Sequence, residues 1–203
     1  MPTTPGKIYI LRNPYLQDSL VKIGKTSRIS EARAKELSAA TGVPGAFEVL
    51  YEEDVFDVDL AETLTHHALD GFRANPRREF FRLPLKIAVR EVASICRDLE
   101  RMQKGHADPR VVIFMNGAAD ANKLKQLVEP YRGGNTKITI AYSNEDSAAE
   151  FHLGDDWRLH LSTGLIRDLQ KWLGCPGTMW IWDEREKTRR EPQEFELEDE
   201  IPF

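Results

Sequence analysis

The chain has 203 residues, 41% of them hydrophobic, which is enough for one large or two small domains with a buried core. Its two cysteines, Cys96 and Cys175, match no metal-ligand or disulfide spacing, so the sequence argues against a zinc site and for a reducing compartment. Of the net charge of −5, most lies at the end: residues 183–203 hold 4 Lys+Arg against 9 Asp+Glu, whereas residues 1–105 hold 16 against 15. The near-neutral body therefore does not exclude a nucleic-acid partner.

The first half of the chain predicts a small mixed sheet flanked by helices. We expect strands at 7–13, 20–26 and 47–55, a helix at 30–41 capped by Ser30, a helix at 59–72, an extended piece at 78–83 and an amphipathic helix at 85–104. The periodicity buries one side of each later helix: Leu60, Ala61, Leu64, Ala68 and Phe72 on the first, Ile87, Val92, Ile95 and Leu99 on the second.

The second half predicts another α+β unit after a linker at 105–109. Its expected elements are a strand at 111–115, a helix at 118–131 closed by Arg132-Gly133-Gly134, strands at 137–142 and 148–153, a turn at 154–156, a helix from the Ser162 cap to Leu173, and a strand at 179–182. The fold class is therefore α+β, with domains at 1–105 and 109–182 and a disordered acidic tail at 183–203.

Five features of the first half follow one another in a specific order. They are Gly6-Lys7-Ile8-Tyr9, then Lys22-Ile23-Gly24-Lys25-Thr26, then Arg33, then Glu62 on a helix, then Glu79-Phe80-Phe81. This order resembles the GIY-YIG nuclease superfamily, in particular its phage-type branch with Lys-Ile-Gly in the second motif. The resemblance covers residues 6–100 and implies a metal-dependent DNA endonuclease that hydrolyses phosphodiester bonds.

The resemblance gives each motif residue a role. Glu62 would be the single protein ligand of Mg²⁺ (or Mn²⁺), which needs few carboxylates because it keeps its waters. Tyr9 would act as general base or orient the attacking water, and Lys22, which replaces the second tyrosine of the family, would tune Tyr9 or contact the phosphate. Arg33 offers a planar fork to phosphate oxygens, and Gly24 lets the backbone approach DNA closely.

Several further residues have both a functional and an ordinary interpretation. His66 lies one turn after Glu62, and Asp59, Glu62, His66 and Asp70 share a helical face that is either part of the catalytic site, with His66 as a catalytic residue, or an ordinary solvated face. Lys25 either contacts DNA or is a surface residue at a strand end. Four arginines form either a DNA-backbone contact or a merely solubilising loop: Arg73, Arg77, Arg78 and Arg82.

The second half resembles the C-terminal domain of the bacterial DNA polymerase III alpha subunit over about 109–178. The residues that carry the likeness are Leu124-Lys-Gln-Leu127, Tyr131-Arg-Gly-Gly134, Lys137-Ile-Thr-Ile140, Leu153-Gly-Asp-Asp-Trp157-Arg158 and Leu165–Leu173. The resemblance implies an interaction module that serves the replicative polymerase or clamp-loader components rather than a catalytic unit. The alternative is a generic α+β domain.

The last ten residues, 194–203, resemble the acidic tip of bacterial single-stranded DNA-binding protein. They end in Asp199-Glu200-Ile201-Pro202-Phe203. Ile201 and Phe203 could enter a small apolar pocket, while the terminal carboxylate and the acidic residues before them meet its basic rim. We therefore expect partner proteins that recognise this tip, with a solubilising tail as the alternative.

Together these features favour a DNA endonuclease tethered to replication or repair machinery. The alternative is a non-catalytic adaptor or decoy that uses the tip to bind replisome proteins. No signal-peptide pattern and no membrane-length apolar run is seen. We therefore expect a cytoplasmic protein without a membrane partner, in a bacterium or a phage-infected cell.

Overall fold

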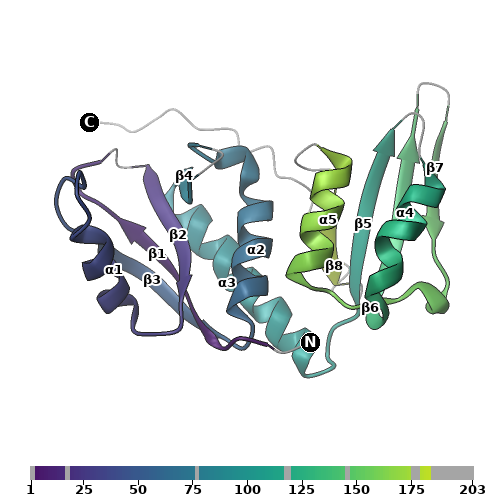
Figure 1. The fold of residues 1–203 in the computed structure, drawn as a ribbon, viewed down its shortest axis with the longest axis horizontal. Helices are drawn as coiled ribbons and strands as arrows, with labels where there is room; N and C mark the ends of the chain where they lie inside the picture. Colours follow the sequence, from purple (N-terminus) through teal and green to yellow (C-terminus); the bar gives the residue numbers. More distant parts are fainter. Residues whose placement is uncertain are drawn as a thin grey trace.

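The protein is a mixed α+β structure (Figure 1), described here from a computed structural model. The structure describes residues 3–16, 19–75, 78–116, 120–144, 147–174 and 179–183. Over these residues the strands form two four-stranded sheets, one in each half of the chain. The expected fold class is therefore confirmed.

The first sheet has the strand order β3-β1-β2-β4 and is antiparallel throughout. Its strands are β1 (Gly6–Arg12), β2 (Leu20–Thr26), β3 (Glu48–Val55) and β4 (Phe80–Arg82). Because side chains alternate along a strand, β1 sends Tyr9 and Leu11 to one face, where they pack with Ala34 of α1 (Ser30–Ser38). Residues Ile8 and Ile10 join the larger core on the other face.

Two helices supply the core of that other face: α2 (Val58–Ala68), followed by a 3-10 turn at Asp70–Phe72, and α3 (Leu85–Gln103). The expected stripe on α3 is correct, with Val92, Ile95 and Leu99 buried and Ile87 packed against them. On α2, Leu60, Ala61 and Leu64 are buried as expected, but Ala68 is exposed and Leu69 is buried instead. The register changes because the α-helix ends at Ala68 and the chain tightens into the 3-10 turn.

The start of α1 differs from the prediction. The helix begins at Ser30 itself, Ile29 occupies the N-cap position, and no side chain caps the helix. Ser30 is fully buried, so its side chain faces the protein interior and does not cap the helix. The helix also ends at Ser38, three residues earlier than expected.

The second sheet has the order β7-β6-β5-β8, with β5 (Pro109–Asn116), β6 (Arg132–Ser143), β7 (Ala148–His152) and β8 (Met179–Asp183). Strands β5 and β6 are parallel and are joined through α4 (Ala121–Val128), and the outer two pairings are antiparallel. The helix α5 (Thr163–Leu173) begins as predicted, with the Ser162 hydroxyl accepting from the Leu165 amide, and ends at Gly174 in the left-handed region.

Helical structure ends before Arg132-Gly133-Gly134, as predicted: α4 continues into a 3-10 turn at Glu129–Tyr131, Arg132 is its C-cap and Gly133 has a φ of 88°. The same segment, unlike the prediction, is also the first part of β6. The reason is a close approach of two backbones: a Cβ on Gly134 would lie 2.0 Å from the Leu159 carbonyl oxygen. A residue with a side chain would be excluded there, so the glycine serves a strand contact rather than a helix end.

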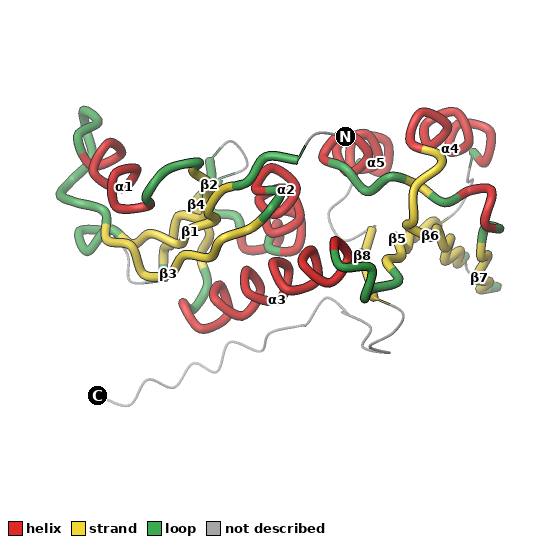
Figure 2. The backbone as a smooth tube through the Cα atoms, turned by 90° about the horizontal axis from the view of Figure 1, so that it is seen from below, coloured by secondary structure: helices red, strands yellow, loops and turns green. Residues whose placement is uncertain are grey.

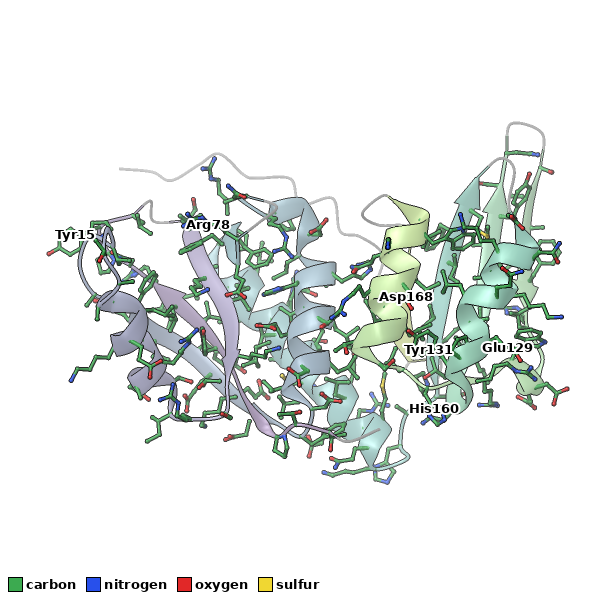
Figure 3. The ribbon with its side chains drawn as sticks, viewed as in Figure 1. Tyr15, Arg78, Glu129, Tyr131, His160 and Asp168 are labelled. Atoms are coloured by element: carbon green, nitrogen blue, oxygen red, sulfur yellow. The ribbon has the colours of Figure 1, made fainter. Side chains whose placement is uncertain are left out.

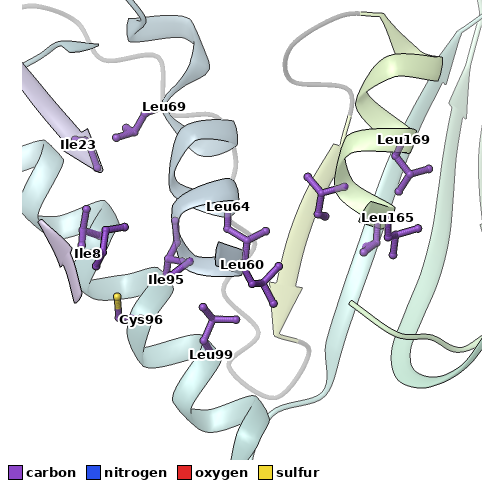
Figure 4. Close-up of a cluster of buried hydrophobic side chains, with 14 of the residues drawn as sticks. Ile8, Ile23, Leu60, Leu64, Leu69, Ile95, Cys96, Leu99, Leu165 and Leu169 are labelled. Carbon is purple, nitrogen blue, oxygen red and sulfur yellow. The ribbon is translucent and has the colours of Figure 1, made fainter. Parts of the chain in front are cut away.

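The two sheets share one hydrophobic cluster (Figure 4). It includes Leu60 and Leu64 of α2, Leu99 of α3, and Leu165 and Leu169 of α5. Figure 2 shows α2 and α5 on the inner sides of their sheets, and the Gln170 amide lies 2.6 Å from Nδ1 of His67 across this boundary. The domain boundaries at 105 and 109 stay a prediction. Of the predicted tail at 183–203, Asp183 is the last residue of β8 and the rest lies outside the described residues.

None of the described helices combines the length and the apolar composition required to cross a bilayer.

Candidate active site

The site is built on the face of the first sheet that carries Tyr9. Tyr9 in β1 pairs with Gly24 in β2, and a Cβ at Gly24 would lie 2.8 Å from the Tyr9 hydroxyl oxygen. The Tyr9 ring therefore lies over a position that only glycine leaves open. Gly24 accommodates the ring of Tyr9, and the close approach of DNA to its backbone stays a prediction.

Arg33 reaches this face from α1. Its guanidinium donates to the Glu36 carboxylate at 3.1 Å, and its charge acts to lower the pKa of the Tyr9 hydroxyl. Burial raises the pKa of Tyr9, and the nearby Arg33 offsets only part of that effect. Tyr9 is therefore a neutral phenol at neutral pH whose own proton remains available for donation.

A second pair, Lys22 and Glu79, lies next to Tyr9. Lys22 is buried, forms an ion pair with Glu79, and has its ammonium 5.6 Å from the centre of the Phe80 ring. Burial opposes ionisation of Glu79, but the hydrogen bond and charge of Lys22 outweigh it, so the pKa of Glu79 lies below its ordinary value. Glu79 is thus a carboxylate at neutral pH.

Glu79 belongs to the motif Glu79-Phe80-Phe81, but the sequence predicted no role for it. The pairing of Phe80–Arg82 with β2 could have indicated a role for Glu79. Lys22 pairs with Phe80 in this register, and Glu79 therefore lies beside the second motif. Periodicity does not reveal a partner 57 residues away.

The polar face of α2 lies against the edge of β2 beyond the end of β4. Lys25 contacts two carboxylates of this helix, with its Nζ 2.6 Å from Asp59 Oδ1 and 2.8 Å from Glu62 Oε2. Burial lowers the pKa of Lys25, but the two carboxylates outweigh it and the net shift is upward. This face is therefore not an ordinary solvated surface.

His66 is held on the same edge. Its Nε2 donates to the Ile23 carbonyl oxygen at 2.9 Å, and its ring centre lies 5.1 Å from that of Phe81. Burial lowers the pKa of His66, and the Ile23 carbonyl only partly opposes this. His66 is a neutral side chain that anchors α2 to β2.

The predicted catalytic residues lie in one electrostatic neighbourhood. The charges of Glu79 and Glu62 both act on Tyr9, and that of Glu79 acts also on Arg33 and His66. A pocket of about 390 Å³ between α1 and β3, lined in part by Ala34 and Phe47, adjoins this face. Glu79, Glu62 and Arg33 thus all act on the phenol of Tyr9.

The four arginines proposed for DNA contact do not share one environment. Arg73 bonds Asp70 at 2.9 Å and lies over the Phe81 ring at 4.9 Å, so its guanidinium is engaged within the fold. Arg78 (Figure 3) and Arg82 are exposed, and Arg77 lies outside the described residues. DNA contact by this loop stays a prediction.

A single protein carboxylate for a metal fits Glu62. In the described part of the chain, no group of three or more His, Cys, Asp or Glu side chains could hold a metal ion. Mg²⁺ can bind through one carboxylate oxygen and keep its waters, and the ion pair with Lys25 uses only Oε2 of Glu62. The same carboxylate could therefore serve both cations, although Lys25 weakens its attraction for the metal.

Side-chain contacts connect the elements of the second half to one another. The Tyr131 hydroxyl donates to Asp168 at 2.6 Å, joining the end of α4 to α5 (Figure 3). Arg132 lies over the Trp157 ring at 4.6 Å. The five predicted partner-binding residues of the tip, Asp199 to Phe203, lie outside the described residues.

Each half of the chain is similar to a known protein domain. Residues 6–100 match the T5orf172 domain, a nuclease-like family, and residues 123–174 match the C-terminal domain of DNA polymerase III subunit alpha. The chain is 30% identical over 93 residues to DNA polymerase III subunit alpha of Escherichia coli K12, and 26% identical to that of Vibrio cholerae O1. Each match covers 44% of this chain but only 8% of the subunit. No solved structure matches the chain significantly.

Proposed function

We propose that the protein is a metal-dependent DNA endonuclease of GIY-YIG type, tethered to replication or repair factors by its second half and its acidic tip. The observation that carries the proposal is the Tyr9–Arg33 pair, with Lys22, Glu79 and Glu62 around it on one sheet face and edge. The nuclease-like family match over residues 6–100 and the polymerase-like match over 123–174 support it.

Each residue has a task in phosphodiester hydrolysis. Arg33 neutralises charge on a non-bridging phosphate oxygen, as a fork-shaped cation does best. Tyr9, whose pKa is raised by burial, keeps its own proton to donate to the phosphate or to the attacking water. Glu62 would hold Mg²⁺ or Mn²⁺, which would supply charge stabilisation at the phosphate.

The test is cleavage of end-labelled single-stranded, duplex and branched DNA by the full chain with Mg²⁺. Arg33→Ala removes the phosphate clamp and should therefore cut at least about 100-fold more slowly. The control Glu100→Gln breaks only the surface ion pair between Glu100 and Lys104 and should cut like wild type. The proposal fails if wild type cuts no substrate or if Arg33→Ala cuts as fast.

A second function, a non-catalytic adaptor, has one observation in its favour. Lys25 forms an ion pair with Glu62. A carboxylate at a site that no longer binds a metal would need such a cation to balance its charge. The adaptor would bind DNA through the first half and replisome proteins through the tip at 199–203. Deleting these five residues should then abolish partner capture and biological effect, whereas an endonuclease lacking them keeps cutting purified DNA.

A further inference from the structure

Hydrolysis of a phosphodiester requires a group that accepts a proton from the attacking water, and the site offers several candidates. Tyr9 is one of them, but it is 1% exposed, and burial raises its pKa so that it stays protonated. A neutral phenol can donate to the water but is a poor acceptor of its proton.

The other described groups at the site, apart from Glu79, are also unsuited to accept this proton. Lys22 and Arg33 are cations, which donate and do not accept. His66 has its Nε2 on the Ile23 carbonyl and lies on the α2 edge of the sheet. Glu62 has a side chain only 14% exposed and is paired with Lys25, and the proposed function reserves it for the metal.

Glu79 differs from all of these. Its side chain is 45% exposed, although its backbone is fixed in the sheet by a bond from the Ile23 amide to the Glu79 carbonyl at 3.1 Å. Lys22 engages Oε2 alone, and a carboxylate has about four lone-pair sites. The group can therefore accept from Lys22 and from a water at the same time.

We infer that Glu79 is the proton acceptor of the hydrolysis and that Lys22 holds its carboxylate beside Tyr9 and Arg33. A bond forms between the oxygen of water and phosphorus, and the bond between phosphorus and the leaving sugar oxygen breaks. The water proton passes to Glu79, and the leaving oxygen takes a proton from solvent. This role rests on the proposed endonuclease function.

The assignment also gives a reason for Lys22 in place of the tyrosine of the second motif. A lysine at this position holds a carboxylate by charge, which a phenol does not, and its ammonium lies over the Phe80 ring. The Lys22–Glu79 pair is in this sense one unit, with Lys22 as the positioning residue.

The test is single-turnover cleavage by the full chain carrying Glu79→Gln or Glu79→Ala, with Ca²⁺-supported DNA binding measured in parallel. General base catalysis contributes about 10²–10⁴ in rate, so both variants should lose at least 100-fold in cutting while binding DNA within about 3-fold of wild type. Sodium formate should restore part of the activity of Glu79→Ala, compared with sodium chloride at equal ionic strength, because it supplies a mobile carboxylate. Formate should not restore Arg33→Ala.

Three results overturn the inference. If wild type cuts and Glu79→Gln cuts at a similar rate, Glu79 is not the proton acceptor, and the endonuclease proposal survives. If Glu79→Ala is inactive and formate leaves it inactive, the carboxylate only supports the fold or Lys22. If wild type cuts nothing, the proposed function fails and the inference fails with it.

Discussion

The contact between Tyr9 and Gly24 fixes the centre of the site at the scale of single residues. The sequence predicted a role for both residues, because the motifs contain them, but not that the Tyr9 ring lies over Gly24. That arrangement follows from the antiparallel register of β1 and β2, which periodicity alone does not determine.

Gly24→Ala tests this contact. The added Cβ would lie 2.8 Å from the Tyr9 hydroxyl and 3.0 Å from its Cζ, and the ring is buried. Overpacking of this kind costs about 1–3 kcal/mol, so the urea midpoint should fall and the Tyr9 ring should be displaced. The control Gly154→Ala, whose Cβ would meet nothing within 4 Å, should leave the midpoint unchanged.

His66 makes stability depend on pH. Its pKa in the folded protein is lowered by burial, so the unfolded chain binds the proton more readily than the folded one. The stability contribution of neutral His66 is therefore full above about pH 6.5, the ordinary pKa of histidine, and is lost as pH falls below it.

Melting temperatures measured between pH 8 and 5 check this dependence. Wild type should lose stability on the acid side, and His66→Gln, which keeps an N–H donor for the Ile23 carbonyl, should lose less. The exposed His106→Gln should behave like wild type. Identical pH profiles for wild type and His66→Gln would contradict the assignment.

At the scale of elements, strong local signals predicted well and long-range ones did not. The strand β2 and the helix α5 appear as expected because alternation, the Ser162 cap and Gly174 are all local. The predicted start of α1 was wrong and the entry of Arg132–Gly134 into β6 was missed, because burial of Ser30 and the approach of Leu159 are tertiary facts. The ion pairs of Glu79 and Lys25 were missed for the same reason.

The cap of α5 gives a prediction at this scale. Ser162 accepts from the Leu165 amide at 3.3 Å, and replacing such a cap by alanine costs about 1 kcal/mol. Ser162→Ala should lower the urea midpoint accordingly, whereas Ser162→Asp should keep it. An unchanged midpoint in Ser162→Ala would show that the cap contributes nothing here.

At the scale of the whole molecule, the shared cluster implies that the halves unfold together. Leu64 lies on α2 of the first half and is 7% exposed, whereas the four tryptophans, Trp157, Trp172, Trp180 and Trp182, are all in the second half. Leu64→Ala should cost about 2–5 kcal/mol. If the halves are coupled, the unfolding transition followed by tryptophan fluorescence should show this loss of stability, although the tryptophans report only on the second half.

Urea titrations followed by tryptophan fluorescence and by circular dichroism measure the coupling. Both signals should shift to the same lower midpoint in Leu64→Ala, and neither should shift in Leu85→Ala, whose side chain is exposed. A tryptophan transition that stays in place would mean that the halves fold independently, as the predicted boundary at 105–109 suggests.

The central claim, that this site cuts DNA, is tested most directly by Glu62→Gln in single-turnover cleavage with DNA binding followed on the same samples. The account predicts that wild type cuts with Mg²⁺ and that Glu62→Gln binds DNA as well but cuts at least about 100-fold more slowly, since it lacks the metal ligand. Equal cutting by the two proteins, or no cutting by wild type, would contradict it.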